Sequence, residues 1–112
     1  MRILLVAYSD SEATTKKIEG LAKAALARGH EVTVFLNGVS VRLVESGRRI
    51  RGFPNLLIDG VRLLVCRTSA TTSGIESPDQ LVGGAEMSSL SELVDLMEES
   101  SKVLFLGQGA SN

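Results

Sequence analysis

The chain has 112 residues and a formal net charge of −1 at pH 7, with 12 basic and 13 acidic side chains scattered along it. We therefore expect one compact domain over residues 1–112, and we expect neither nucleic acid nor a membrane as a partner, because no broad basic surface would attract them. The single cysteine, Cys66, excludes an internal disulfide, a C-x-x-C redox pair and an all-cysteine zinc site, so no metal site is expected.

A nearly continuous apolar run over residues 2–8 predicts a first strand that is covered on both faces. Its apolar part, residues 3–7, is too short for a membrane span or a signal-peptide core, so we expect a cytoplasmic protein. A helix follows, capped by Asp10 or Ser11 and ending near Gly29. Its predicted inner face comprises Ile18, Leu21, Ala22, Ala25 and Leu26. The next strand, residues 32–36, is expected to run parallel to the first, because a helix joins the two.

The middle of the chain predicts two short helical segments and a third strand. Asn37-Gly38 predicts a turn, followed by a short helix over residues 39–44 that stops at Gly47. A second helical turn is expected over residues 54–59, with Gly60 after its end. The third strand, residues 61–66, is expected to end at Cys66 and to open into a polar loop over residues 68–74.

The last third of the chain predicts a helical turn, a longer helix and a final strand. Residues 77–80 have the S-x-x-Q form of a capping box, and Gly83-Gly84 limits that helix to little more than a turn. Residues 89–92 form a second capping box, which begins the longer helix. The residues that this helix is expected to bury are Leu90, Leu93, Val94 and Met97. The final strand is predicted over residues 103–106.

This alternation predicts an α/β fold. We expect a small three-layer sandwich, with a parallel sheet of four to five strands, helices on both faces and a flavodoxin- or Rossmann-like topology. Ligand and reaction sites of such sheets lie at the carboxyl ends of the strands. Three segments are expected to meet there: residues 8–15, 37–40 and 66–75.

The first loop and the single histidine are weak candidates for chemistry. The loop of residues 8–15 is rich in hydroxyls but has no glycine, and Asp10 and Glu12 would repel a phosphate, so we expect a capped helix start and no cofactor. His30 is expected in a turn at the amino edge of the sheet. A strand of five or six residues would separate it from Cys66 by roughly 17–20 Å, so we expect no Cys-His dyad within one chain.

Arg48, Arg49 and Arg51, with Arg42 nearby, form the strongest basic patch of the sequence. Such a run is usually a solvated face. If this segment folds toward the carboxyl edge, it would instead hold an acidic partner or an anionic sulfur species.

Cys66 has two readings, a small buried hydrophobe or a reactive thiol. It is the last residue of its apolar run, so we expect its side chain to meet solvent. Arg67, Thr68 and Ser69 would offer a positive charge and hydroxyl donors to a thiolate, and the capped helix start at Ser77 would add a favourable dipole. A lone thiol of this kind needs no second catalytic group to accept a sulfur atom as a persulfide.

The stretches "GVRLLVCRTSATTSGI" and "GGAEMSSLSELVDLMEESSKVLFL", together with the earlier "VFLNGVSV", resemble the DsrE/DsrF-like family, which includes sulfur-relay proteins. The resemblance implies that Cys66 is the sulfur acceptor and that members assemble as trimers or hexamers. Many members have an arginine where this chain has Ser73, and Arg67 is the candidate substitute. The binding residues expected around the cysteine are Asn37, Gly38, Arg67, Thr68, Ser69 and Gly74.

The leading hypothesis is therefore a small sulfur carrier, a possible sulfurtransferase. Its expected partners are further copies of itself or related subunits, and thiol-bearing donor and acceptor proteins. A peroxiredoxin-like single-cysteine protein is one alternative, which predicts rapid sulfenic acid formation at Cys66. A non-catalytic oligomeric binding or assembly module with Cys66 buried is another, and a nucleotide or flavin binder is the last.

Overall fold

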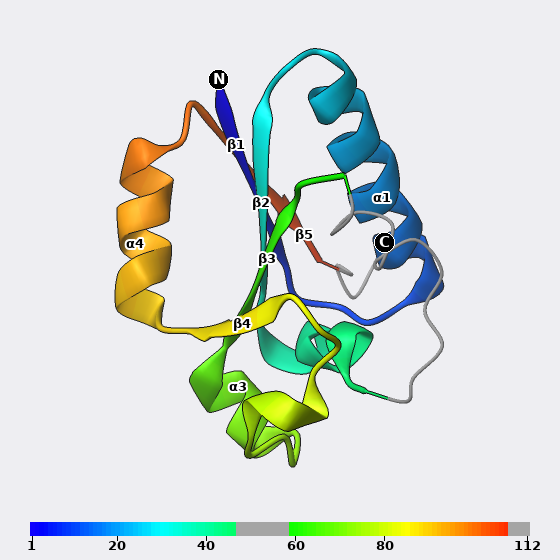
Figure 1. The fold of residues 1–112 in the computed structure, drawn as a ribbon, viewed down its shortest axis with the longest axis vertical. Coiled ribbons are helices and arrows are strands. Elements are labelled where there is room, and N and C mark those ends of the chain that lie inside the picture. The colour runs from blue at the N-terminus through cyan, green and yellow to red at the C-terminus, as the bar shows by residue number, and fades with distance from the viewer. Residues whose placement is uncertain (47–58, 108–112) are drawn as a thin grey trace.

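The computed structural model describes residues 1–46 and 59–107 as a five-stranded parallel sheet in the order β4-β3-β2-β1-β5, with helices on both faces (Figure 1). The strands are β1 (Arg2–Ala7), β2 (Glu31–Leu36), β3 (Arg62–Cys66), β4 (Ala85–Ser88) and β5 (Lys102–Leu106). The helical segments are α1 (Glu12–Ala27), the 3₁₀ helix η1 (Gly38–Val44), α3 (Arg67–Thr72), the 3₁₀ turn η2 (Pro78–Gln80) and α4 (Leu90–Glu99). The predicted α/β fold is therefore confirmed. Among the described residues, no helix is long and apolar enough to cross a membrane.

The helix α1 begins and ends as the sequence predicts. Ser11 is its N-cap, and the Ser11 Oγ accepts the backbone N–H of Thr14 at 3.1 Å. After the helix ends, Gly29 adopts a φ of 80°, which favours glycine. Of the predicted inner face, Ile18, Ala22 and Ala25 are buried, Leu26 is partly buried and Leu21 is exposed.

The hydrophobic core has two layers because strand side chains alternate between the faces of the sheet. The larger layer lies under α1 and contains Leu63 and Val65 of β3. The smaller layer lies under α4, on the opposite face, and contains Leu64 and Cys66 (Figure 1). Its full set of buried residues is Leu4, Val6, Phe35, Leu64, Cys66 and Leu93.

Two elements next to Cys66 differ from the prediction. The segment expected as a polar loop begins with the helix α3, in which the hydroxyls of Thr71 and Thr72 donate to the carbonyls of Arg67 and Thr68. The sequence shows no apolar periodicity there, because this short helix buries only Ala70. The strand β4 was also not predicted, since its four residues are too few to show a strand pattern.

The middle of the chain is partly described. The expected short helix is the 3₁₀ helix η1, which begins at Gly38 and has Asn37 as its N-cap. The Arg42 guanidinium donates to the Ser73 carbonyl at 3.3 Å and lies 3.6 Å from a Glu45 carboxylate oxygen. The predicted stop at Gly47, most of the predicted turn over residues 54–59, and the patch of Arg48, Arg49 and Arg51 lie outside the described residues.

The helix α4 lies on the face of the sheet opposite α1 (Figure 1). Ser89 caps it as predicted, with its Oγ accepting the N–H of Glu92 at 3.1 Å. Leu93 is buried, but the expected burial of Leu90, Val94 and Met97 is wrong, because these side chains are exposed. Leu90 and Val94 are about half exposed and Met97 is 38% exposed, so the described residues cover this flank of the helix only in part.

Candidate functional site

Cys66 ends β3 at the carboxyl edge of the sheet, as predicted, but it does not meet solvent. Cys66 is 2% exposed, so the expectation that its side chain meets solvent is wrong for the single chain. The cover comes from two elements that are distant in sequence. β4 pairs with β3 on its outer side, and α4 contributes Leu93 to the same apolar cluster.

Ser88 is the strand neighbour of Cys66. The two residues are Cα partners in the parallel pairing of β3 and β4, so their side chains project from the same face of strands about 4.8 Å apart. Ser88 is 4% exposed, and its hydroxyl donates to a carboxylate oxygen of Glu92. The other Glu92 oxygen lies 3.4 Å from one guanidinium nitrogen of Arg62. Another nitrogen of the same guanidinium lies 3.3 Å from a Glu86 carboxylate oxygen. A chain of polar contacts therefore runs from the surface to the side of the cysteine.

Sequence reasoning missed this arrangement at Ser88 and Glu92. The segment "SSLSE" indicated a capping box, and the Ser89 half of that box is present. The Glu92 carboxylate, however, contacts Ser88 and Arg62. The available signal in the sequence is an acidic residue in the first turn of a helix that follows a serine-rich strand end. This signal carries no information about the contact with β3.

Three of the predicted binding residues lie together. The Gly38 N–H donates to the Asn37 Oδ1 at 2.9 Å and to the Ser69 Oγ at 2.9 Å, and the Ser69 hydroxyl donates to the Asn37 Oδ1 at 2.7 Å. Asn37 and Gly38 follow β2, and Ser69 lies in the first turn of α3. This cluster joins the carboxyl ends of β2 and β3, the two strands that bring Asn37 and Cys66 to the same edge.

The other three predicted binding residues are spread over α3. Arg67 and Thr68 are exposed in its first turn. Gly74 follows its opposite end with a φ of 84°, so about 9 Å of helix separates it from Cys66. Gly74 is therefore not beside the thiol. The helix start next to Cys66 is that of α3, for which Cys66 is the N-cap without a side-chain bond, and the start at Ser77 lies beyond it.

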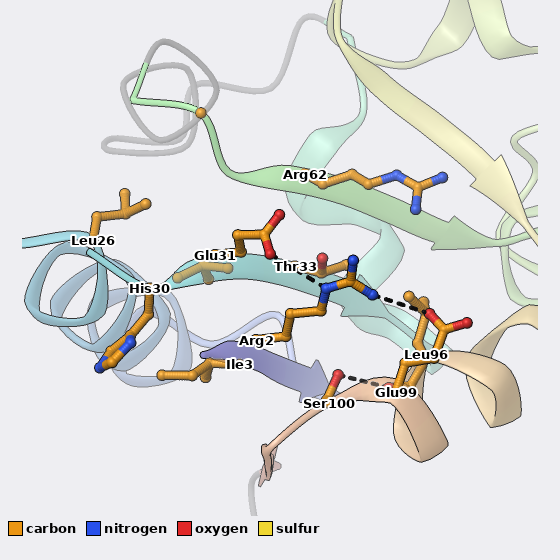
Figure 2. A pocket seen from close by; sticks show the side chains of 12 residues that line it. Arg2, Ile3, Leu26, His30, Glu31, Thr33, Arg62, Leu96, Glu99 and Ser100 are labelled. Atoms are coloured by element: carbon orange, nitrogen blue, oxygen red, sulfur yellow. Dashed lines mark hydrogen bonds and ion pairs between the residues drawn. The ribbon is translucent and has the colours of Figure 1, made fainter. Parts of the chain in front are cut away.

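The remaining candidates lie elsewhere. The first loop is the expected capped helix start, and Tyr8 at its beginning stacks on Phe105 with ring centroids 6.2 Å apart. His30 lies at the amino edge, with its Nδ1 3.3 Å from the N-terminal amine. It lines a cavity of ≈ 390 Å³ at that edge, across which Arg2 pairs with Glu31 and Glu99 (Figure 2). This cavity contains none of the predicted site residues.

Gly38 holds the turn of the cluster in a conformation that favours glycine, with a φ of 57°. An added Cβ would lie 3.6 Å from the Tyr8 carbonyl oxygen, an ordinary contact, so the cost of Gly38→Ala is backbone strain. We expect a loss of about 1 kcal/mol in the free energy of unfolding. Gly20→Ala is the matched control, because Gly20 lies within α1 with nothing within 4 Å, and it should add roughly 0.5–1 kcal/mol. Urea unfolding measures the free energy of unfolding of both variants. A change of the same sign in the two variants would contradict the expectation.

The comparisons with known proteins agree on one fold. The model of the DsrE/DsrF-like family matches residues 1–106. The crystal structure of the YchN protein from E. coli is similar, with a TM-score of 0.74 and 22% identity, covering 94% of this chain and 98% of that one. MTH1491 from Methanobacterium thermoautotrophicum, a protein of unknown function, has a TM-score of 0.83 and 18% identity, covering 93% of this chain and 97% of that one. A search of curated proteins found no match.

Proposed function

The chain belongs to the DsrE/DsrF-like family, and from this premise we propose that it carries sulfane sulfur as a persulfide on Cys66 and passes it to a cysteine of a partner protein. The family is associated with sulfur relay, and this chain has one cysteine. The observation that carries the proposal is the place of that cysteine. It ends β3 at the carboxyl edge, where parallel α/β sheets bind their ligands.

The proposed transfer is an exchange at sulfur. The Cys66 thiolate attacks the outer sulfur of a donor persulfide, R–S–SH, and a new S–S bond forms. The S–S bond of the donor breaks, and its electron pair leaves with the donor as R–S⁻. A thiolate of the acceptor protein then attacks the outer sulfur held on Cys66, and Cys66 is released as a thiolate. Neither step needs an external oxidant or reductant.

Loading with inorganic polysulfide tests the proposal. Intact-mass measurement should show one added sulfur, about 32 Da, that thiol reductants remove and that Cys66→Ser abolishes. The variant is a close control, because serine replaces one side-chain atom at a buried position. The same mass change in both proteins, or no change in the wild type, rejects the proposal.

A second candidate function is a non-catalytic assembly module of the same fold. The burial of Cys66 favours it, because a thiol at 2% exposure has the environment of a packing residue. The two functions differ in whether the cover over Cys66 opens in the native protein. Thiol alkylation measures that opening and therefore distinguishes them.

We further propose that the protein associates with copies of itself, or with related subunits, through an exposed apolar surface. The α4–β5 surface consists of Leu90, Val94 and Met97 on α4 and of Phe105 on β5. Phe105 pairs with Val6, which lies in the layer under α4, so Phe105 projects from the face of the sheet that carries α4. Val94 and Phe105 are 53% and 54% exposed. The three α4 residues form one stripe, since they are spaced by four and three residues. Glu92 on the other flank contacts β3 and β4, so this stripe faces the β5 side. Exposed apolar residues gathered in this way mark interaction sites.

A further inference from the structure

One carboxylate, that of Glu92, links the start of α4 to the strands beside it. Leu93 packs in the cluster that contains Cys66, and Glu92 immediately precedes it in the first turn of α4. The two Glu92 oxygens contact different strands: one accepts the Ser88 hydroxyl on β4, and the other pairs with Arg62 on β3. The start of α4 is thus tied to β3, the strand that ends in the cysteine, and to its neighbour β4.

We infer that Glu92 is a positioning residue that fastens the first turn of α4 over Cys66 and thereby sets how often the thiol is accessible. The inference rests on the proposed function for its purpose, because a sulfur carrier must open to its donor and acceptor. In the contact with Ser88, Ser88 is buried while the Glu92 side chain is 38% exposed, so this contact is partly protected from water. The Arg62 contact is half exposed, and Arg62 divides its charge between Glu92 and Glu86, so it adds less.

Ser88 links this fastening to sulfur chemistry. Its hydroxyl has one proton, which it donates to Glu92, so toward Cys66 it offers only acceptor lone pairs. An anionic sulfur on Cys66 needs a donor. When the first turn of α4 lifts and the bond to Glu92 breaks, the Ser88 hydroxyl is free to rotate and donate to the sulfur. In the open state the Ser88 hydroxyl, at the strand position paired with Cys66, is therefore available as a donor to the loaded form.

Alkylation rates of native Cys66 test the inference, because a buried thiol reacts in proportion to its open population. We expect Glu92→Ala to react about tenfold faster than the wild type, as expected for the loss of one charge-assisted hydrogen bond and one half-exposed ion pair. Glu92→Gln should fall between them, because its amide oxygen still accepts the Ser88 hydroxyl. Glu98→Gln, an exposed substitution on the same helix, should leave the rate unchanged.

The global stability of each variant, from urea unfolding, separates local from general effects. The inference holds if the alkylation rate rises from the wild type to Glu92→Gln to Glu92→Ala. The accompanying loss in the free energy of unfolding must also be smaller than the loss that would account for the increase in rate. A rate in Glu92→Ala that is equal to or slower than the wild-type rate overturns it, as does a rise fully matched by lost stability. If Glu92→Ala does not fold, Glu92→Gln alone decides, with about a threefold increase expected. These alkylation rates are independent of persulfide loading, so this inference can fail or hold separately from the sulfur-carrier proposal.

Discussion

Val94→Glu is expected to convert the self-associated protein into single chains without unfolding it. In the single chain Val94 is more than half exposed, so a glutamate at this position stays in water and the fold is retained. In the assembly a second copy would cover the α4–β5 surface and leave the new carboxylate buried without a partner. That costs about 3 kcal/mol or more, which weakens association at least about 100-fold.

Analytical ultracentrifugation over a concentration series measures this effect. The wild type should sediment as an oligomer and Val94→Glu as a monomer, with unchanged circular dichroism. Ala24→Glu is the control, because it adds the same charge at an exposed position of α1, on the opposite face of the sheet. If Ala24→Glu dissociates the protein equally, net charge rather than the α4–β5 surface is responsible. A wild type that is monomeric at every concentration removes the proposal of self-association.

The same surface shows the limit of helical periodicity as a predictor. The spacing of Leu90, Leu93, Val94 and Met97 correctly indicated an amphipathic helix. Periodicity states which residues share a flank but not what lies against that flank. α4 turns Leu93 toward the sheet and leaves the other three exposed, because they lie on the flank away from Glu92, which contacts β3 and β4. A second subunit is the kind of neighbour that a single sequence cannot place.

The candidate site was predictable where strand order alone decides it. Asn37 and Ser69 follow two parallel strands, so their meeting at one edge follows from the fold, and the hydrogen bond between them confirms it. The burial of Cys66 was not predictable in this way. It depends on β4, a strand of four residues, and on Leu93, which is 27 positions away in sequence. The partner of Glu92 on β3, Arg62, is equally remote in sequence, so the local pattern around Glu92 indicates only a helix cap.

Alkylation of wild-type Cys66 by iodoacetamide is expected to be about 100-fold slower in the native protein than in the unfolded chain at the same pH. The thiol has almost no exposed surface, so the reagent reaches it only after an opening. Lifting one helical turn is a local event, which we place at roughly 2–3 kcal/mol, against about 5–15 kcal/mol for unfolding a domain. At 1.4 kcal/mol per factor of ten, the local event corresponds to about two decades of rate.

A control thiol makes this ratio interpretable. Ser91→Cys in a Cys66→Ser background places a cysteine at an exposed position of α4, where the native and unfolded rates should agree within a few-fold. Mass spectrometry follows both proteins over time. Native and unfolded rates that are also equal for Cys66 would show that the thiol is not covered in solution, contrary to the structure.

The dependence of the native rate on urea then decides between the two functions. A local opening exposes little surface, so its rate should rise only weakly with urea well below the unfolding midpoint. That result fits a carrier whose cover lifts while the domain stays folded. If instead the rate rises with the full dependence of global unfolding, Cys66 is reached only in the unfolded chain. A thiol that no native state exposes cannot exchange sulfur with a partner, and the assembly module would then be the function that the buried cysteine supports.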